Sequence, residues 1–157
     1  MRKILLSIIC LLALNTISFA SPQFGLMAEQ NAGLGPMISL EKINAHLLLT
    51  STSNDSSSET NTTKISIGVE YKVPVANKIT GLLGLHYGTT SGELDGSDID
   101  TLTTVGLSIG IAHAITDKLM AHTKMSVVEF SDYGDDNADF QTTSIFTNVR
   151  VGICHLF

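Results

Sequence analysis

Several residue types are scarce in this chain of 157 residues. Tryptophan is absent, and cysteine occurs twice, at Cys10 and Cys154. Nine Lys and Arg stand against 15 Asp and Glu, which gives a formal net charge of −6. Without a basic patch, the chain lacks the electrostatic footprint of a nucleic-acid-binding protein. No apolar run reaches the roughly 20 residues that a membrane-spanning helix needs.

The first 20 residues have the three parts of a secretory signal peptide. Arg2 and Lys3 form a basic start, residues 4–14 are apolar, and small residues surround a cleavage point after Ala20. We therefore expect residues 1–20 to be removed and residues 21–157 to form one exported domain. A buried N-terminal helix is the alternative. Cys10 follows Ile9 rather than a small residue, which argues against a lipoprotein.

Removal of this segment would leave a more acidic chain. Arg2 and Lys3 leave with it, so seven basic residues would face 15 acidic ones, a net charge of −8. Cys154 would be the only cysteine, which excludes an intramolecular disulfide, and we expect it to be a small core residue. The mean hydropathy is nonetheless positive, at +0.26. A barrel explains this combination, because its apolar residues occupy alternate positions instead of long runs.

The last 13 residues alternate between two faces up to the aromatic residue that ends the chain. This period of two predicts a strand. Termini usually fray into water, so an apolar face that continues to the last residue favours a strand closing a barrel in lipid. One face carries Ile145, Thr147, Val149, Val151, Ile153, His155 and Phe157, and the other carries Phe146, Asn148, Arg150, Gly152, Cys154 and Leu156.

Similar alternation predicts an all-β, antiparallel, up-and-down transmembrane barrel of eight strands. An even count places both termini on the same side of the membrane. The alternative is one long bulged strand over residues 34–50, preceded by a coil or plug. The eight expected strands cover residues 24–28, 38–40, 43–50, 64–73, 79–88, 101–114, 118–130 and 141–157, with a loop at 31–36 and a turn near Glu41-Lys42.

The connections between these strands alternate between long and short. Long polar loops are expected at residues 51–63, 89–100 and 131–140, and short turns at 74–78 and 115–118. Outer-membrane barrels have this pattern, with long outer loops and short periplasmic turns. Lys72, Lys78 and Lys118 flank the short turns. The long loops contain no Lys or Arg but carry Asp55, Glu59, Glu93, Asp95, Asp98, Asp100, Asp132, Asp135, Asp136 and Asp139.

The polar face is expected to line the lumen. Glu70, Lys72, Lys124 and Arg150 lie on it, and charges of both signs can pair there as a lumenal ion-pair network. The same face is rich in glycine, which suits a narrow lumen. A soluble, lipocalin-like periplasmic barrel with the apolar face inward is the alternative.

The remaining polar groups predict no catalytic, cofactor or metal site. His86 and His122 share the lumenal face, and we expect them to pair there with acidic groups or water. His122 and Ser126 are separated by about 13 Å along a strand, which is too far for a hydrogen bond. The acidic loops lack the spacing of an EF-hand and are interpreted as solvated, although divalent cations could bridge them weakly to lipopolysaccharide phosphates.

On these features, residues 21–157 resemble the small outer-membrane β-barrels of the OmpX and OmpA-transmembrane-domain type. The signal peptide, the final strand, and the units at residues 68–73 and 84–88 carry the resemblance. It implies a monomer in the outer membrane of a Gram-negative cell, surrounded by the lipid bilayer and lipopolysaccharide. It also implies a C-terminal signal for the barrel-assembly machinery at Val149, Val151, Ile153, His155 and Phe157, with His155 where the family usually has an aromatic residue.

The resulting functional hypothesis is a non-enzymatic structural or surface-interaction protein. Its acidic outer loops would contact a host or surface ligand, as in an adhesin. A small porin-like channel is the main alternative. A lipid-modifying barrel enzyme with a His–Ser pair at its outer rim is a further one, although no His here is followed closely by Ser in a motif of that kind.

Overall fold

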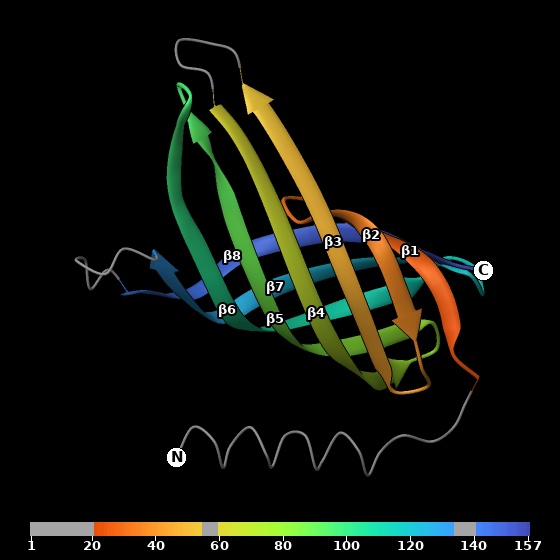
Figure 1. Ribbon diagram of the computed structural model, residues 1–157. Helices are drawn as coiled ribbons and strands as arrows, with labels where there is room; N and C mark the ends of the chain where they lie inside the picture. The colour runs from red at the N-terminus through yellow and green to blue at the C-terminus, as the bar shows by residue number, and fades with distance from the viewer. Residues whose placement is uncertain (1–20, 55–59, 134–140) are drawn as a thin grey trace.

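The computed structural model describes residues 21–54, 60–133 and 141–157. Within them, eight antiparallel strands follow one another around a closed up-and-down barrel (Figure 1). This confirms the predicted fold and excludes a single bulged strand over residues 34–50. No helix among the described residues is long and apolar enough to cross a membrane. The strands are β1 (Gln23–Glu29), β2 (Gly33–Ser39), β3 (Ile43–Asn54), β4 (Thr60–Ala76), β5 (Ile79–Leu94), β6 (Ser97–Ala114), β7 (Leu119–Tyr133) and β8 (Gln141–Leu156).

The apolar face of the barrel points outward. In β4, Ile67 and Val69 are exposed, whereas their neighbours Ser66 and Glu70 are buried in the lumen. The same alternation holds along the middle of β6 and the end of β8. A belt of exposed large apolar side chains is costly in water but suits contact with lipid. The lipocalin-like alternative, with the apolar face inward, is therefore wrong.

A small apolar cluster fills part of the lumen. Its buried members come from β1, the β1–β2 turn, β2, β3 and β8, and Met120 of β7 packs against them. Cys154 is 3% exposed and belongs to this cluster, as expected for a small core residue. The buried members are Met27, Ala32, Met37, Leu48, Cys154 and Leu156.

The outer hairpins are longer than the sequence predicts. β3 and β4 stay paired to Asn54 and Thr60, and β5 and β6 stay paired to Leu94 and Ser97. Most of the described residues in the predicted loops 51–63, 89–100 and 131–140 are therefore strand, while 55–59 and 134–140 lie outside the described residues. The strand pairing continues here although the side chains no longer alternate between apolar and polar. Threonine is common in these segments and favours β-strands. The predicted loop at 31–36 is likewise only a turn before β2.

Pro74 does not end strand pairing, contrary to the prediction of a turn over residues 74–78. It pairs with Thr80, and β4 continues to Ala76 through a register shift. Two residues earlier, the Lys72 backbone N–H donates to the Lys42 carbonyl at 2.8 Å. The backbone nitrogen of Pro74 faces the same neighbouring strand, but β3 begins only at Ile43 and does not extend to the level of Pro74. The missing N–H of Pro74 therefore costs no hydrogen bond of the sheet.

Two bulges change which residues face the lumen. In the first, Leu107 of β6 pairs with Val128 of β7, and Ser108 pairs with Ser126. One residue of β7 between these two pairs therefore has no partner. A second register shift lies in β8, where Lys124 opposes Arg150 and Ser126 opposes Thr147. The alternation predicts Thr147 outward and Phe146 inward, but Phe146 is 64% exposed and the Thr147 hydroxyl is buried. Bulges explain this reversal, because one inserted residue switches the side-chain parity beyond it.

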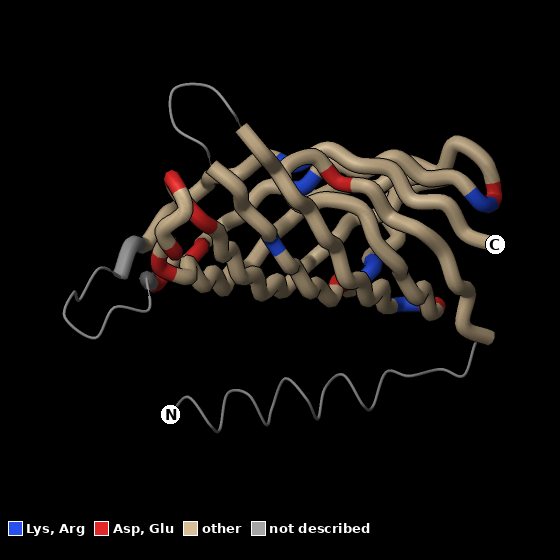
Figure 2. Tube along the Cα trace, turned by 45° about the horizontal axis from the view of Figure 1, so that its top comes forward, with Lys and Arg blue, Asp and Glu red and all other residues tan. Residues whose placement is uncertain are grey.

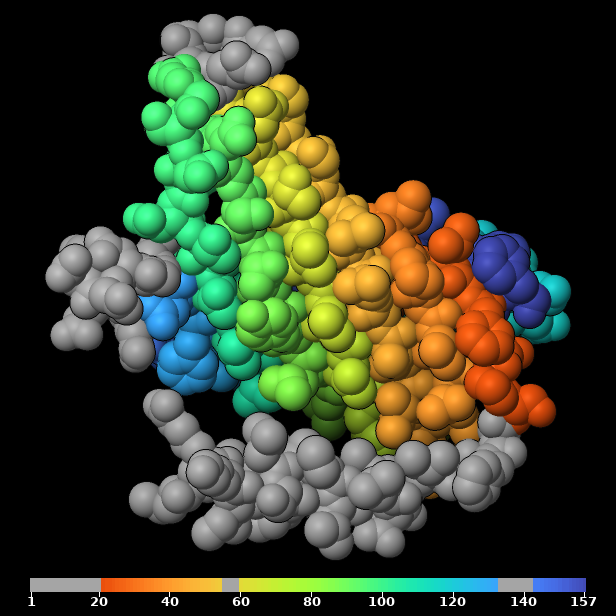
Figure 3. All heavy atoms as spheres, in the orientation of Figure 1, coloured from red at the N-terminus to blue at the C-terminus, as the bar shows by residue number. Residues whose placement is uncertain are grey.

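The β1–β2 hairpin is the shortest part of the wall. β1 and β2 have 7 residues each, whereas β4 has 17 and β6 has 18. In Figures 1 and 3, the yellow and green outer ends of β4 and β5 project far beyond the orange turn between β1 and β2. The outer rim of the barrel is therefore uneven, and its lowest point lies between β3 and β8.

Candidate functional site

Lys124 of β7 lies at the centre of the charged lumen. Its Nζ atom is 2.5 Å from Glu70 Oε1 in β4 and also forms an ion pair with Glu29 in β1. All three side chains are at most 3% exposed. The cross-strand partner of Lys124 is Gly110, and the lysine stem occupies the place that a side chain there would take. Lys124 thus links three strands across the lumen.

Glu29 gathers further partners from β7 and β8. Its Oε2 atom is 3.1 Å from His122 Nε2, and its Oε1 atom is 3.3 Å from Arg150 Nη1. The Glu29 side chain is fully buried. A buried carboxylate is costly unless it is paired, and here it faces two cations and an imidazole.

A second group of contacts surrounds Glu129 of β7. His86 Nε2 lies 3.1 Å from Glu129 Oε2, and Asn148 donates to Glu129 Oε1 at 2.7 Å. Ser126 donates to Glu129 at 3.2 Å and accepts a hydrogen bond from Arg150 Nη2 at 3.1 Å. Because Arg150 also contacts Glu29, it joins the two groups into one network.

Three lumenal histidines each face a glycine on a neighbouring strand. The cross-strand pairs are His46 with Gly68, His86 with Gly106, and His122 with Gly152. In each pair, a Cβ atom on the glycine would overlap the imidazole ring. The glycines that the sequence places on the polar face therefore provide the space in which the rings lie.

The four residues predicted for the lumenal network are placed differently. Glu70 and Lys124 are in direct contact, and Asn44 donates to Glu70 at 3.4 Å. Arg150 reaches Glu29 instead of Glu70. Lys72 stands apart and donates to Ser39 Oγ at 2.9 Å. His86 and His122 contact carboxylates, as expected for lumenal histidines.

Glu29 and Glu129 are the members of the network that the sequence pattern missed. Glu29 ends a strand of only 7 residues, in a region where the alternation is weak. It does, however, share parity with Gly25 and Met27, and that signal was available. Glu129 enters the lumen only through the bulge in β7, which alternation alone does not reveal.

The network can fill and brace the lumen. Its deeply buried carboxylates Glu29 and Glu70 are opposed by Lys124 and Arg150, and Glu129 is held by His86, Ser126 and Asn148. Among the residues that the structure describes, no group of three His, Cys, Asp or Glu side chains is arranged to hold a metal ion.

The two ends of the barrel differ in charge (Figure 2). Lys42, Lys78 and Lys118 lie at the turns on the side of the chain termini, together with Glu41 and Asp117, so this end carries charges of both signs. The described outer parts of β3 to β8, at residues 51–54, 60–63, 89–104, 131–133 and 141–144, contain no Lys or Arg. Their exposed acidic side chains are Glu93, Asp95, Asp98, Asp100 and Asp132.

The C-terminal residues close the barrel against β1. The Phe157 backbone N–H donates to the Phe24 carbonyl at 2.9 Å. The side chains on the outer face are at least half exposed: Val149 58%, Val151 50%, Ile153 53% and Phe157 67%. The Phe157 ring lies 5.5 Å from the His155 ring, centroid to centroid, at 56°.

A closed eight-stranded barrel with an apolar outer belt and a charged, filled lumen defines a small membrane β-barrel. Residues 12–150 match the model of the outer membrane protein beta-barrel domain family. The chain therefore belongs to this family, whose members are proteins of the outer membrane. No curated protein matches the chain.

Several solved structures, including the following three, are similar to the chain. Neisserial surface protein A (NspA) has 19% sequence identity and a TM-score of 0.48, covering 87% of this chain and 96% of that chain. Ail, the attachment invasion locus protein of Yersinia pestis, has 13% identity and a TM-score of 0.46, covering 86% and 92%. A major outer membrane protein from Thermus thermophilus has 15% identity and a TM-score of 0.43, covering 88% and 100%.

Proposed function

We propose that this barrel is a non-enzymatic surface-interaction protein, which contacts a host or surface ligand through its acidic outer hairpins. The single sign of the charge at the outer end carries the proposal. The described parts of the outer hairpins expose Glu93, Asp95, Asp98 and Asp100, and their sequence contains no Lys or Arg. A surface of one sign attracts partners of the opposite sign and raises their rate of association.

The filled lumen supports a contact role over transport. Lys124 connects Glu29 and Glu70 across the interior, and Met27, Met37 and Leu48 are almost fully buried beside this network. A small porin-like channel is the alternative function. It would require an open path past these side chains, and conductance measurements separate the two functions.

The proposal includes export by the segment 1–20, delivery to the barrel-assembly machinery through the C-terminal residues, and a monomeric state in a bilayer containing lipopolysaccharide. The outward row that ends at Phe157 supports the second of these steps, because its side chains are accessible before the barrel enters lipid.

Adhesion of cells that display the protein to an epithelial monolayer tests the surface role. Asp98→Asn with Asp100→Asn should reduce adhesion relative to the unmodified protein, because it removes two outer charges. The matched control is Glu41→Gln with Asp117→Asn, which removes two charges at the opposite end and should leave adhesion unchanged. Equal adhesion of both variants, at equal amounts of folded barrel at the cell surface, would contradict the proposal.

A further inference from the structure

The short β1–β2 hairpin leaves a side opening in the wall between β3 and β8. β8 pairs with β1 only between Gly152 and Leu156. One residue earlier, the Val151 carbonyl accepts a hydrogen bond from the Gln30 backbone N–H at 2.8 Å. Among the described residues, 141–150 of β8 have no strand on this side. Phe146 and Asn148, with φ of 52° and 54°, further disturb this free edge.

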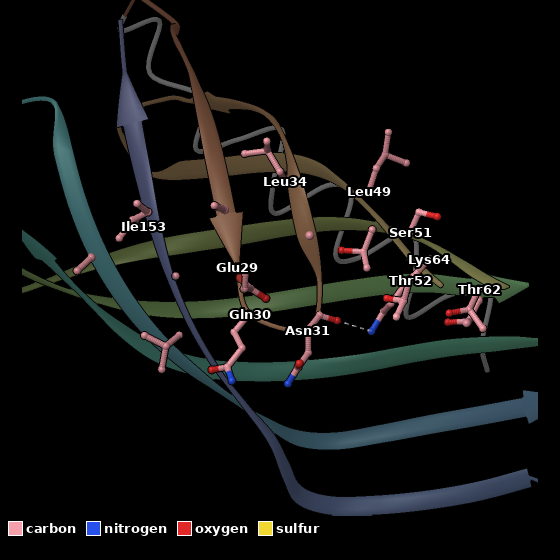
Figure 4. Close-up of a pocket in the computed structure, with 17 residues that line it drawn as sticks. Glu29, Gln30, Asn31, Leu34, Leu49, Ser51, Thr52, Thr62, Lys64 and Ile153 are labelled. Carbon is pink, nitrogen blue, oxygen red and sulfur yellow. Dashed lines mark hydrogen bonds between the residues drawn. The ribbon is translucent and has the colours of Figure 1, made fainter. Parts of the chain in front are cut away.

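A cavity of about 1000 Å³ occupies the side opening (Figure 4). Its lining includes the outward-facing, lipid-side residues Leu34, Leu49 and Ile153. It also includes Lys64 and Thr62, which face the interior from β4, the strand next to β3. A continuous wall would separate these two groups, so their presence in one cavity shows that the outer lumen and the outward face of the barrel are continuous at this opening.

Lys64 provides the charge at this site. Its Nζ atom donates to the Asn31 backbone carbonyl at 3.1 Å, the bond drawn as a dashed line in Figure 4. No carboxylate of the described residues lies within ion-pair distance of Lys64, in contrast to Lys124. A second cavity, of about 90 Å³, adjoins this region and shares Lys64 and Asn31 with the first.

Lys64 lies at the outer end of the apolar belt. It pairs with Thr50, one step beyond the outward apolar pair of Leu49 and Ile65. Past Leu49, the outward row of β3 continues with Ser51 and Ser53. The apolar belt therefore ends where Lys64 begins the polar part of the cavity, and cations at this level attract anionic lipids.

We propose that the side opening is a binding site for a phosphate-bearing lipid of the surrounding leaflet. Its acyl chain lies along Leu34, Leu49 and Ile153, and its phosphate is held by Lys64. The headgroup oxygens also accept hydrogen bonds from backbone N–H groups along residues 141–150 of β8, which pair with no strand on this side. Such groups would be unsatisfied in hydrocarbon. This occupant matches the two parts of the lining, one apolar and one polar with Lys64. The Glu29 carboxylate, which also lines the cavity, is already paired with Lys124.

The absence of tryptophan permits a direct test in the full-length barrel. Leu34→Trp places a single fluorophore at the edge of the side opening, at a position that is 57% exposed. The variant is reconstituted in phosphatidylcholine vesicles containing phosphatidic acid, with bromine atoms on the chains of one lipid or the other. Bromine quenching should show about a fivefold preference for phosphatidic acid at this position. Adding Lys64→Gln should reduce the preference to about one.

Two controls assign the preference to the site. Leu83→Trp reports on a lipid-facing position of β5, 53% exposed and outside the cavity lining, and should show no preference. Leu49→Trp reports from the other edge and should reproduce the Leu34→Trp result. Equal quenching by both lipids at Leu34→Trp, or a preference that survives Lys64→Gln, would overturn the proposal. Protection of Leu34→Trp from both brominated lipids would also overturn it, because a second copy of the chain would then cover the opening.

Discussion

The imidazole ring of His122 in β7 lies over Gly152, its cross-strand partner in β8. The same ring contacts Glu29 at 3.1 Å. A methyl group at position 152 would overlap both the ring and the Ala28 backbone carbonyl. We therefore expect Gly152→Ala to move His122 away from Glu29 and to lower the free energy of unfolding by about 1–3 kcal/mol.

Urea unfolding of the barrel in detergent micelles measures this effect. Gly81→Ala is the matched control, because its new Cβ atom would meet only ordinary contacts of 3.4 Å or longer. Its free energy of unfolding should stay close to that of the unmodified protein. Equal losses of free energy of unfolding for both variants would show that the His122–Gly152 contact does not contribute to stability.

Removal of the central cation should have a larger effect. Lys124→Met keeps the length of the side chain but leaves Glu29 and Glu70 buried without their shared partner. The expected loss is about 3–5 kcal/mol in the free energy of unfolding, because an uncompensated buried charge is costly. Lys118→Met, at an exposed turn, should cost far less.

A double-mutant cycle separates charge from packing at Lys124. Adding Glu70→Gln to Lys124→Met removes one of the stranded charges, so the double variant should be more stable than the sum of the two single losses predicts. Strict additivity would mean that Lys124 and Glu70 do not interact, which would contradict the ion pair in the lumen.

The filled lumen predicts a closed barrel in planar bilayers. The unmodified protein should show no steady conductance, because Lys124, Glu29 and Glu70 meet across the interior. Glu70→Ala removes one side of this contact and should allow brief or steady openings. Asp98→Ala, which also removes one carboxylate but at the outer rim, should remain silent. Steady conductance of the unmodified protein would favour the channel over the surface-interaction function.

The barrel, and which face of its wall points to lipid, could be predicted because side chains alternate between the two faces along each strand. In β6, Val105, Leu107 and Ile109 alternate with Gly106 and Ser108, and lipid outside makes this pattern sharp. Residues in such regular stretches of strand, including Glu70 and Lys124, are assigned to the correct face. The prediction depends only on local sequence, so it holds wherever the ladder is regular.

Parity could not predict the positions where the ladder is irregular. Glu129 reaches the lumen after a bulge, and Phe146 faces outward beside another, because one added residue reverses the faces. Parity also does not predict the length of the outer hairpins, because segments made of Ser and Thr show no alternation between apolar and polar residues. One signal was present. Asp95-Gly96, with φ of 50° and 77°, forms the two-residue turn that Asp-Gly favours in hairpins.

The C-terminal residues should matter more for assembly in cells than for stability. Phe157→Ala removes an outward side chain that is 67% exposed, while its backbone bond to Phe24 does not depend on the ring. We expect less heat-modifiable barrel in the outer membrane but unchanged urea unfolding after refolding in micelles. Leu156→Ala, which truncates a side chain only 4% exposed in the core cluster, should instead lower the free energy of unfolding by about 2–5 kcal/mol. Normal assembly of Phe157→Ala would show that the final aromatic residue is not part of an assembly signal.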